Sequence, residues 1–233
     1  MSNQPLHSWN QALKLAIEPL ADENNASNMQ AYMRDKFLFY GIQSSPRRQA
    51  IKHLFSKEGL PSINSLAEIV RELWSLPQRE YQLIAVDLLI KYKHQLPLSY
   101  ADELEFLITT KSWWDSVDML ATHIASALFQ NYPQQMAPYI NRWRNSDDIW
   151  LRRTALLYQL KFKQQTDIGL LFEIILENQH DKEFFIQKAI GWALREYSKT
   201  DPTAVIKFID DEEIDGLAKR EGLKWLRDNS NLV

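Results

Sequence analysis

Apolar residues recur at spacings of three and four along almost the whole chain, and alternating runs of β-branched residues are nearly absent. This period predicts helix after helix and no strand. Two apolar stripes are the clearest, one in residues 81–92 and one in residues 117–128, and each is typical of a helix that buries one face. They consist of Tyr81, Ile84, Ala85, Leu88, Leu89 and Tyr92, and of Val117, Leu120, Ala121, Ile124, Ala125 and Leu128.

A third stripe, in residues 184–195, has the same period but a mixed character, with two cations and a tryptophan among its apolar members. Short breaks rich in Gly, Pro, Asn and Asp separate the predicted helices, and Asp201 and Ser99 are suitable N-terminal caps. The mixed stripe consists of Phe184, Phe185, Lys188, Ala189, Trp192 and Arg195.

Predicted helix pairs recur roughly every 35 to 45 residues, which is the period of two-helix solenoid repeats. The pattern therefore predicts an all-α, HEAT-like helical-repeat solenoid of about six antiparallel helix pairs, whose concave face would hold a large ligand. Self-similarity between the pairs is weak, so an irregular helical bundle is the alternative. No linker or low-complexity segment interrupts the chain, and we expect residues 1–233 to form a single domain.

Composition excludes several folds and several kinds of active site. The chain has six Gly and nine Pro among 233 residues, too few for the close turns of a sandwich or barrel. It has no Cys, which excludes a disulfide framework, a thiolate nucleophile and a Cys-based zinc site. Motifs for nucleotide phosphates and for a serine nucleophile are absent, and we expect no cofactor. The five histidines lack paired ligand spacing, so we expect no metal and place them at the surface or at caps. They are His7, His53, His94, His123 and His180.

The first residues are polar, and no stretch is long and apolar enough for a signal peptide or a membrane span, so we expect a cytoplasmic protein without a membrane partner. The formal charge is −3, which by itself argues against nucleic acid. The charge is segregated, however: residues 34–52 and 142–163 are locally basic, whereas residues 210–215 are acidic. If alternate helices line one face, the basic clusters would meet there and follow a phosphate backbone.

Eight Trp is a surplus for this length, and two of them stand in unusual company. In the segment KSWWDSVD, Trp114 and Asp118 are four residues apart and would share one helix face. Lys188, Trp192 and Arg195 would share another, and an Arg152–Arg153 pair interrupts an apolar helix start. These residues also have a purely structural interpretation, in which the tryptophans fill the core, the acids cap helices and the cations face solvent.

Four segments together resemble the DNA alkylation repair family of AlkD-type alkylpurine DNA glycosylases. They are YMRDKFLFYGIQSSPRR at 32–48, KSWWDSVD at 111–118, IWLRRTALL at 149–157 and FFIQKAIGWALREYSKTDP at 184–202. The resemblance implies a HEAT-like fold with a concave groove for duplex DNA. It also implies hydrolysis of the N-glycosidic bond of cationic 3- and 7-alkylated purines such as 3-methyladenine and 7-methylguanine, without base flipping.

The resemblance carries over to individual residues. Asp118 matches the catalytic carboxylate, Trp114 and Trp192 match aromatics around the deoxyribose, and Arg153 matches an arginine at the DNA backbone. Tyr32 and Gln43 match groove residues, and the basic clusters add further expected DNA contacts. These are Arg47, Arg48, Arg152, Lys161, Lys188 and Arg195.

Two other functions stay open on the sequence: a helical-repeat scaffold for protein partners, and a relative that binds DNA without cleaving it. The presence of all four central residues favours the glycosylase. A monomer would suit a solenoid that wraps its ligand. Neither the N-terminal dozen residues nor the acidic stretch at 210–215 falls within the matched segments.

Overall fold

The structure is a computed structural model that describes residues 7–229. Within that range the chain is helical and forms no β-strand, apart from an isolated parallel bridge between Leu38 and Gln78. The predicted all-α class is confirmed. The contacts group into two compact units divided after Tyr92, which we describe one at a time, and the single domain expected over residues 1–233 stays a prediction.

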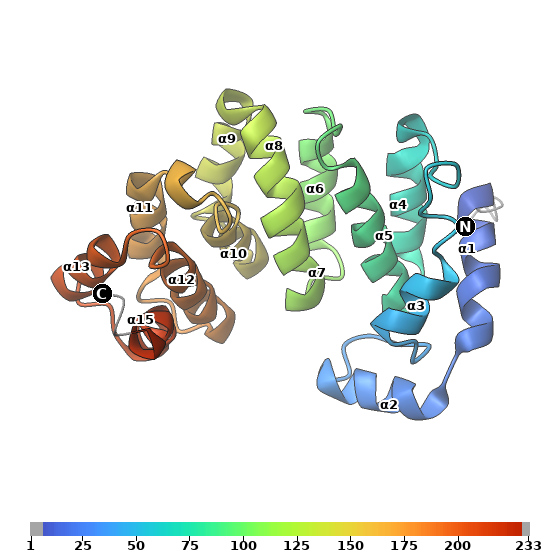
Figure 1. Cartoon of the computed structure of the whole chain (residues 1–233), viewed down its shortest axis with the longest axis horizontal. Coiled ribbons are helices and arrows are strands. Elements are labelled where there is room, and N and C mark those ends of the chain that lie inside the picture. The colour runs from blue at the N-terminus through green and yellow to red at the C-terminus, as the bar shows by residue number, and fades with distance from the viewer. Residues whose placement is uncertain (1–6, 230–233) are drawn as a thin grey trace. The chain divides into compact units, whose positions relative to one another are not determined.

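The first unit contains five α-helices and two short 3-10 turns between residues 7 and 92. Figure 1 shows them in blue to green. The elements are α1 Ser8–Ile17, η1 Glu18–Leu20, α2 Glu23–Tyr32, α3 Ser44–Ala50, η2 Ile63–Ser65, α4 Leu66–Ser75 and α5 Arg79–Tyr92.

Helix α5 is the core element of this unit, and the whole stripe predicted in residues 81–92 is buried. One carboxylate at its start organises the chain before α3. Fully buried Glu80 accepts hydrogen bonds from the backbone N–H groups of Tyr40, Gly41 and Ile42 at 3.0 to 3.1 Å. Gly41 is required there, because its φ is +85° and an added Cβ would lie 2.1 Å from the Asp22 carbonyl oxygen.

The second unit contains the remaining helices, drawn in green to red in Figure 1. The elements are α6 Tyr100–Thr109, α7 Trp114–Met119, η3 Leu120–Ala125, α8 Ser126–Asn131, α9 Pro133–Trp143, α10 Ile149–Leu157, η4 Lys163–Gln165, α11 Ile168–Asn178, α12 Phe184–Tyr197, α13 Pro202–Asp211, α14 Gly216–Gly222 and α15 Lys224–Asp228.

The stripe predicted in residues 117–128 is also buried, and it runs without interruption through α7, η3 and α8. The middle element is a π-helix, which the apolar period does not predict. A π turn is rare and is frequently found at functional sites. It begins two residues after Asp118, and the Thr122 hydroxyl donates to the Asp118 carbonyl oxygen at 2.7 Å.

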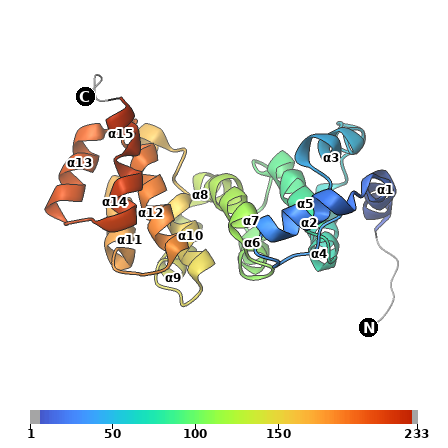
Figure 2. The ribbon, with the colours of Figure 1, turned by 90° about the horizontal axis from the view of Figure 1, so that it is seen from below.

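Helix α12 lies between α10 and α14, as the view in Figure 2 shows. Two glycines allow α12 and α14 to cross closely. A Cβ on Gly191 would lie 2.5 Å from Cβ of Glu221 and 3.0 Å from the Ala218 carbonyl oxygen. A Cβ on Gly222 would lie 3.1 Å from Cβ of Leu194. The crossing fixes the position of Glu221 against α12.

The two suggested caps behave differently. The Asp201 carboxylate accepts from the Ala204 backbone N–H at 2.9 Å and caps α13 as expected. Ser99 precedes α6 but forms no side-chain cap, because its backbone is already helical at φ −57° and ψ −13° rather than extended.

Candidate active site

The centre of the site is an ion pair between Asp118 on α7 and Arg153 on α10. The Arg153 Nε donates to one carboxylate oxygen at 2.7 Å and its NH2 group donates to the other at 2.9 Å. The third guanidinium nitrogen donates to the Phe185 carbonyl oxygen at the start of α12. Only 6% of the Arg153 side chain and 16% of the Asp118 side chain are exposed. The arginine therefore holds the carboxylate in a fixed orientation.

This environment acts on the Asp118 carboxyl in two directions. Burial raises its pKa above the ordinary value, and the negative charge of Asp115 adds to the rise. The hydrogen bonds and the positive charge of Arg153 oppose it. Without Arg153, burial would favour the neutral acid.

A pocket of about 380 Å³ opens beside the ion pair. Trp114 from α7, Arg153 from α10 and Trp192 from α12 all line it. Three of the four residues to which the resemblance gives a central role thus share one pocket wall, and the fourth, Asp118, is bonded to Arg153. The mixed stripe of α12 explains the remaining lining, which consists of Phe184, Phe185, Lys188 and Arg195, together with Glu221 from α14.

The tryptophans separate by burial. Trp114 and Trp192 are half-buried and reach the pocket. Directly behind the pocket, buried Trp113 packs against Trp150 and Phe185 with ring centroids 5.6 and 5.0 Å apart. Of the other six tryptophans, Trp225 is half-buried, and the rest are buried: Trp9, Trp74, Trp113, Trp143 and Trp150.

Glu221 is a member of the pocket that sequence reasoning missed. Its two carboxylate oxygens accept from Lys188 Nζ and from Arg195 NH1, each at 2.9 Å. The Lys188 hydrogen bond, followed by the other favourable contacts of these two cations, holds the pKa of Glu221 below its ordinary value despite partial burial. The signal for it was indirect: a glycine inside the α12 pattern, Gly191, marks a close helix crossing.

The local basic cluster at residues 142–163 is largely neutralised in the structure. Arg142 pairs with Glu105, and Arg144 pairs with Glu173 and Glu177. Arg152, an expected DNA contact, donates to Asp181 at 2.6 Å and to the Ser146 carbonyl oxygen. Counting charge along the chain therefore overstates the positive surface, because the partner acids come from other elements. Lys161 is exposed and lies close to His123, with 3.3 Å between Lys161 Nζ and His123 Nε2.

Four expected DNA contacts belong to the first unit. Tyr32 at the end of α2 is 71% exposed, and Gln43 is exposed at the residue before α3. Arg48 is exposed, whereas Arg47 is buried, and both lie 3.5 Å from the carboxylate of Asp87. Their roles toward DNA stay predictions.

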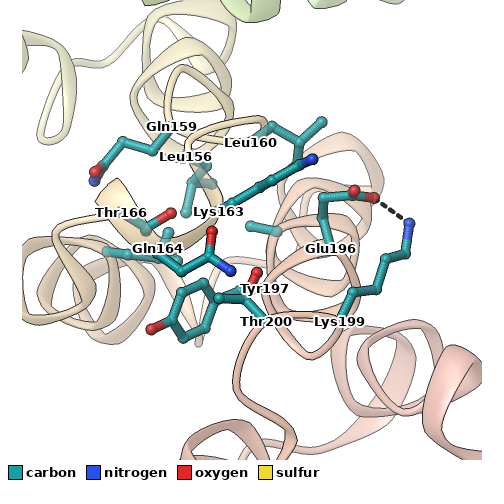
Figure 3. A pocket seen from close by; sticks show the side chains of 12 residues that line it. Leu156, Gln159, Leu160, Lys163, Gln164, Thr166, Glu196, Tyr197, Lys199 and Thr200 are labelled. Atoms are coloured by element: carbon teal, nitrogen blue, oxygen red, sulfur yellow. Dashed lines mark hydrogen bonds and ion pairs between the residues drawn. The ribbon is translucent and has the colours of Figure 1, made fainter.

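A second pocket of the same unit as Asp118, of about 370 Å³, has none of the predicted site residues in its lining. Figure 3 shows its polar wall, including Gln159 and Gln164, and the Glu196–Lys199 ion pair at 2.5 Å. It lies where the C-terminal end of α12 faces the end of α10, away from the stripe that lines the tryptophan pocket. It offers no carboxylate held against an aromatic pair.

Residues 13–226 match the family model of DNA alkylation repair enzymes. The chain belongs to the DNA alkylation repair enzyme family. A solved structure described as a predicted DNA alkylation repair enzyme from Enterococcus faecalis is similar, with 32% sequence identity and a TM-score of 0.82. The match covers 88% of this chain and 96% of the other. No match is found among curated proteins.

Family membership agrees with the resemblance seen in the sequence, and it makes the chain a DNA repair enzyme by family. Among residues 7–229, no group of three or more His, Cys, Asp or Glu side chains is placed to hold a metal ion. No helix within that range is both long and apolar enough to cross a membrane.

Proposed function

We propose that this family member is a monofunctional DNA glycosylase of base excision repair, which hydrolyses the N-glycosidic bond of cationic 3- and 7-alkylated purines in duplex DNA. The observation that carries the proposal is the Asp118 carboxylate, oriented by Arg153 beside a pocket lined by two half-buried indoles. We further propose that the enzyme acts as a cytoplasmic monomer on nucleoid DNA and needs no cofactor.

The chemistry explains why these residue types suffice. Alkylation at N3 or N7 makes the purine a cation, so it leaves as a neutral base when the electrons of the C1′–N bond move onto it. Positive charge then develops on the deoxyribose. An ionised carboxylate next to that sugar stabilises the charge, as it does in glycoside hydrolysis. Water adds to C1′ and loses a proton to Asp118 or to solvent.

Trp114 and Trp192 would contribute through their faces. A cation near an indole face is stabilised by roughly 0.5 to 2 kcal/mol, with the larger value in desolvated sites. Both side chains line the same pocket, so both faces would act on one charged sugar. Recognition through the charged sugar removes the need to extrude the base, and we propose that flipping is not used.

Arg153 would act chiefly through Asp118. Its Nε and NH2 groups are engaged with the carboxylate and its third nitrogen with the Phe185 carbonyl oxygen. The resemblance implies a backbone contact for this residue, and the ion pair supports a second proposed role, in keeping Asp118 ionised and oriented. Such a pair is pre-organised before substrate binds, which is how electrostatic catalysis avoids reorganisation cost.

The test is release of free bases from methylated duplex DNA. Wild-type protein should release 7-methylguanine and 3-methyladenine. Trp114→Ala and Trp192→Ala should each slow the release while leaving binding to undamaged duplex close to wild type. If the wild-type protein binds duplex but releases no base, the glycosylase proposal fails and a non-catalytic DNA-binding role is the better account.

A further inference from the structure

A small cavity of about 220 Å³ lies beside the π-helix in the second unit. Three separate segments supply its ionisable side chains: Lys93 and His94 precede α6, His123 lies on η3, and Lys161 follows α10. Its remaining lining is uncharged and consists of Thr122, Ser126, Ala127, Gln130 and Phe162. No carboxylate lines the cavity.

The charges at this cavity lack compensation. Neither Lys93 nor Lys161 forms an ion pair with a carboxylate among residues 7–229, whereas every arginine from Arg142 to Arg195 does. A cluster of cations held together without an acid is unfavourable in the free protein. Such an arrangement is typical of a site that awaits an anion.

His123 is the histidine that departs from the surface or capping role expected from the sequence, because it is half-buried. Burial, with the charges of Lys161 and Lys93, lowers the pKa of His123 to about 4. Its Nε2 lies 3.3 Å from Lys161 Nζ, so the neutral ring accepts from the lysine and its other nitrogen carries the proton. When an anion binds, the ring can take up a proton at Nε2 and donate from that nitrogen as well.

The π-helix connects this cavity with the site described above. Asp118 is the last residue but one of α7, and His123 follows it by five residues, which is about one turn of a π-helix. His123 therefore lies about one turn beyond Asp118 on one continuous helical segment. A ligand at His123 would lie along the same helix as the proposed catalytic carboxylate.

We propose that this cavity binds a phosphate group, with Lys93, His123 and Lys161 as its ligands, and that the phosphate belongs to the backbone of the DNA. The source of the phosphate rests on the proposed function; the phosphate chemistry of the cavity does not. Two lysines and one ring N–H match the tetrahedral acceptor pattern of a phosphate.

The first arm of the experiment uses inorganic phosphate as the probe. The His123 proton resonance, assigned with the His123→Gln variant, is titrated by NMR against pH with and without phosphate. A bound anion favours the charged imidazole, so phosphate should move the His123 titration to higher pH. Lys161→Gln should abolish this effect, and the matched variant Lys163→Gln, two residues along at the start of η4 and outside the cavity, should preserve it.

The second arm identifies the source and uses undamaged duplex, so it does not depend on base release. The salt dependence of binding should lose about 0.9 in slope for Lys161→Gln, the value for one phosphate contact, and nothing for Lys163→Gln. A His123 titration that phosphate does not move, in the wild type, would overturn the site. A phosphate effect with equal salt slopes for the two variants would refute DNA as its source.

Discussion

Replacing Arg153 with Gln should move the acidic limb of the pH–activity profile to higher pH. In the wild type, burial already raises the pKa of Asp118, and Arg153 limits the rise through two hydrogen bonds of 2.7 and 2.9 Å. An opposite charge in contact lowers a carboxyl pKa by about 1 to 3. Removing it should therefore shift the acidic limb by roughly 1 to 3 pH units, equivalent to about 1.4 to 4 kcal/mol in favour of the neutral acid.

The same substitution should destabilise the fold in a pH-dependent way. Breaking a buried ion pair by removing one partner costs about 3 to 5 kcal/mol when the other group stays charged. In the variant, the folded pKa of Asp118 lies further above the unfolded value, so the folded state binds the extra proton. Its stability is therefore greatest below the unfolded pKa and falls as pH rises through the folded pKa. The deficit against wild type should be larger at pH 8 than at pH 5.

Base release from methylated duplex across pH, combined with denaturant unfolding at both pH values, measures both effects. Arg144→Gln is the matched control, because Arg144 is 10% exposed and also pairs with carboxylates, Glu173 and Glu177. It should lose stability without moving the acidic limb. Arg153→Lys, which retains the charge, should keep the limb near wild type. If Arg153→Gln and wild type share one acidic limb, Arg153 does not control Asp118 and the reasoning is refuted.

Three further substitutions test the neighbouring parts of the site. Glu221→Gln should release Lys188 and Arg195 from their shared carboxylate, so duplex binding, measured by fluorescence anisotropy, should become stronger and more steeply salt-dependent. Weaker binding would indicate instead that Glu221 positions the two cations. Gly191→Ala should lower the free energy of unfolding by about 1 to 3 kcal/mol, because the added Cβ would lie 2.5 Å from Cβ of Glu221. Gly169→Ala, whose added Cβ meets nothing closer than 3.5 Å, should leave thermal stability unchanged or raise it. Trp113→Ala truncates a core side chain and should lower the free energy of unfolding by about 3 to 5 kcal/mol. Trp114→Ala should lower stability less but reduce base release more, and the opposite result would place Trp114 in the core.

The parts of this structure that follow from local periodicity could be predicted from the sequence. The stripes at 81–92 and 117–128 are buried because a 3.6-residue period brings their apolar side chains to one face. The mixed stripe of α12 lines the pocket for the same reason: Phe184, Lys188, Trp192 and Arg195 share one face. The proximity of Trp114 to Asp118 also follows from their spacing on one helix.

The parts that depend on contacts between distant segments could not be predicted in this way. Glu221 reaches Lys188 and Arg195 only because Gly191 and Gly222 let α14 approach α12. The acids that neutralise Arg144 and Arg152 come from α11 and from the turn after it, so a local charge count cannot find them. The π turn at Leu120–Ala125 leaves the apolar stripe intact and therefore gives no signal in the sequence.

The most direct test of the account compares Asp118→Asn with wild type in release of 7-methylguanine from methylated duplex DNA. Asp115→Asn, a change of the same kind one turn earlier on α7, is the matched control. The account predicts that Asp118→Asn folds, as judged by circular dichroism, and still binds duplex but loses most of the release, while Asp115→Asn stays near wild type. Release by Asp118→Asn at close to the wild-type rate would contradict the assignment of Asp118 as the catalytic carboxylate.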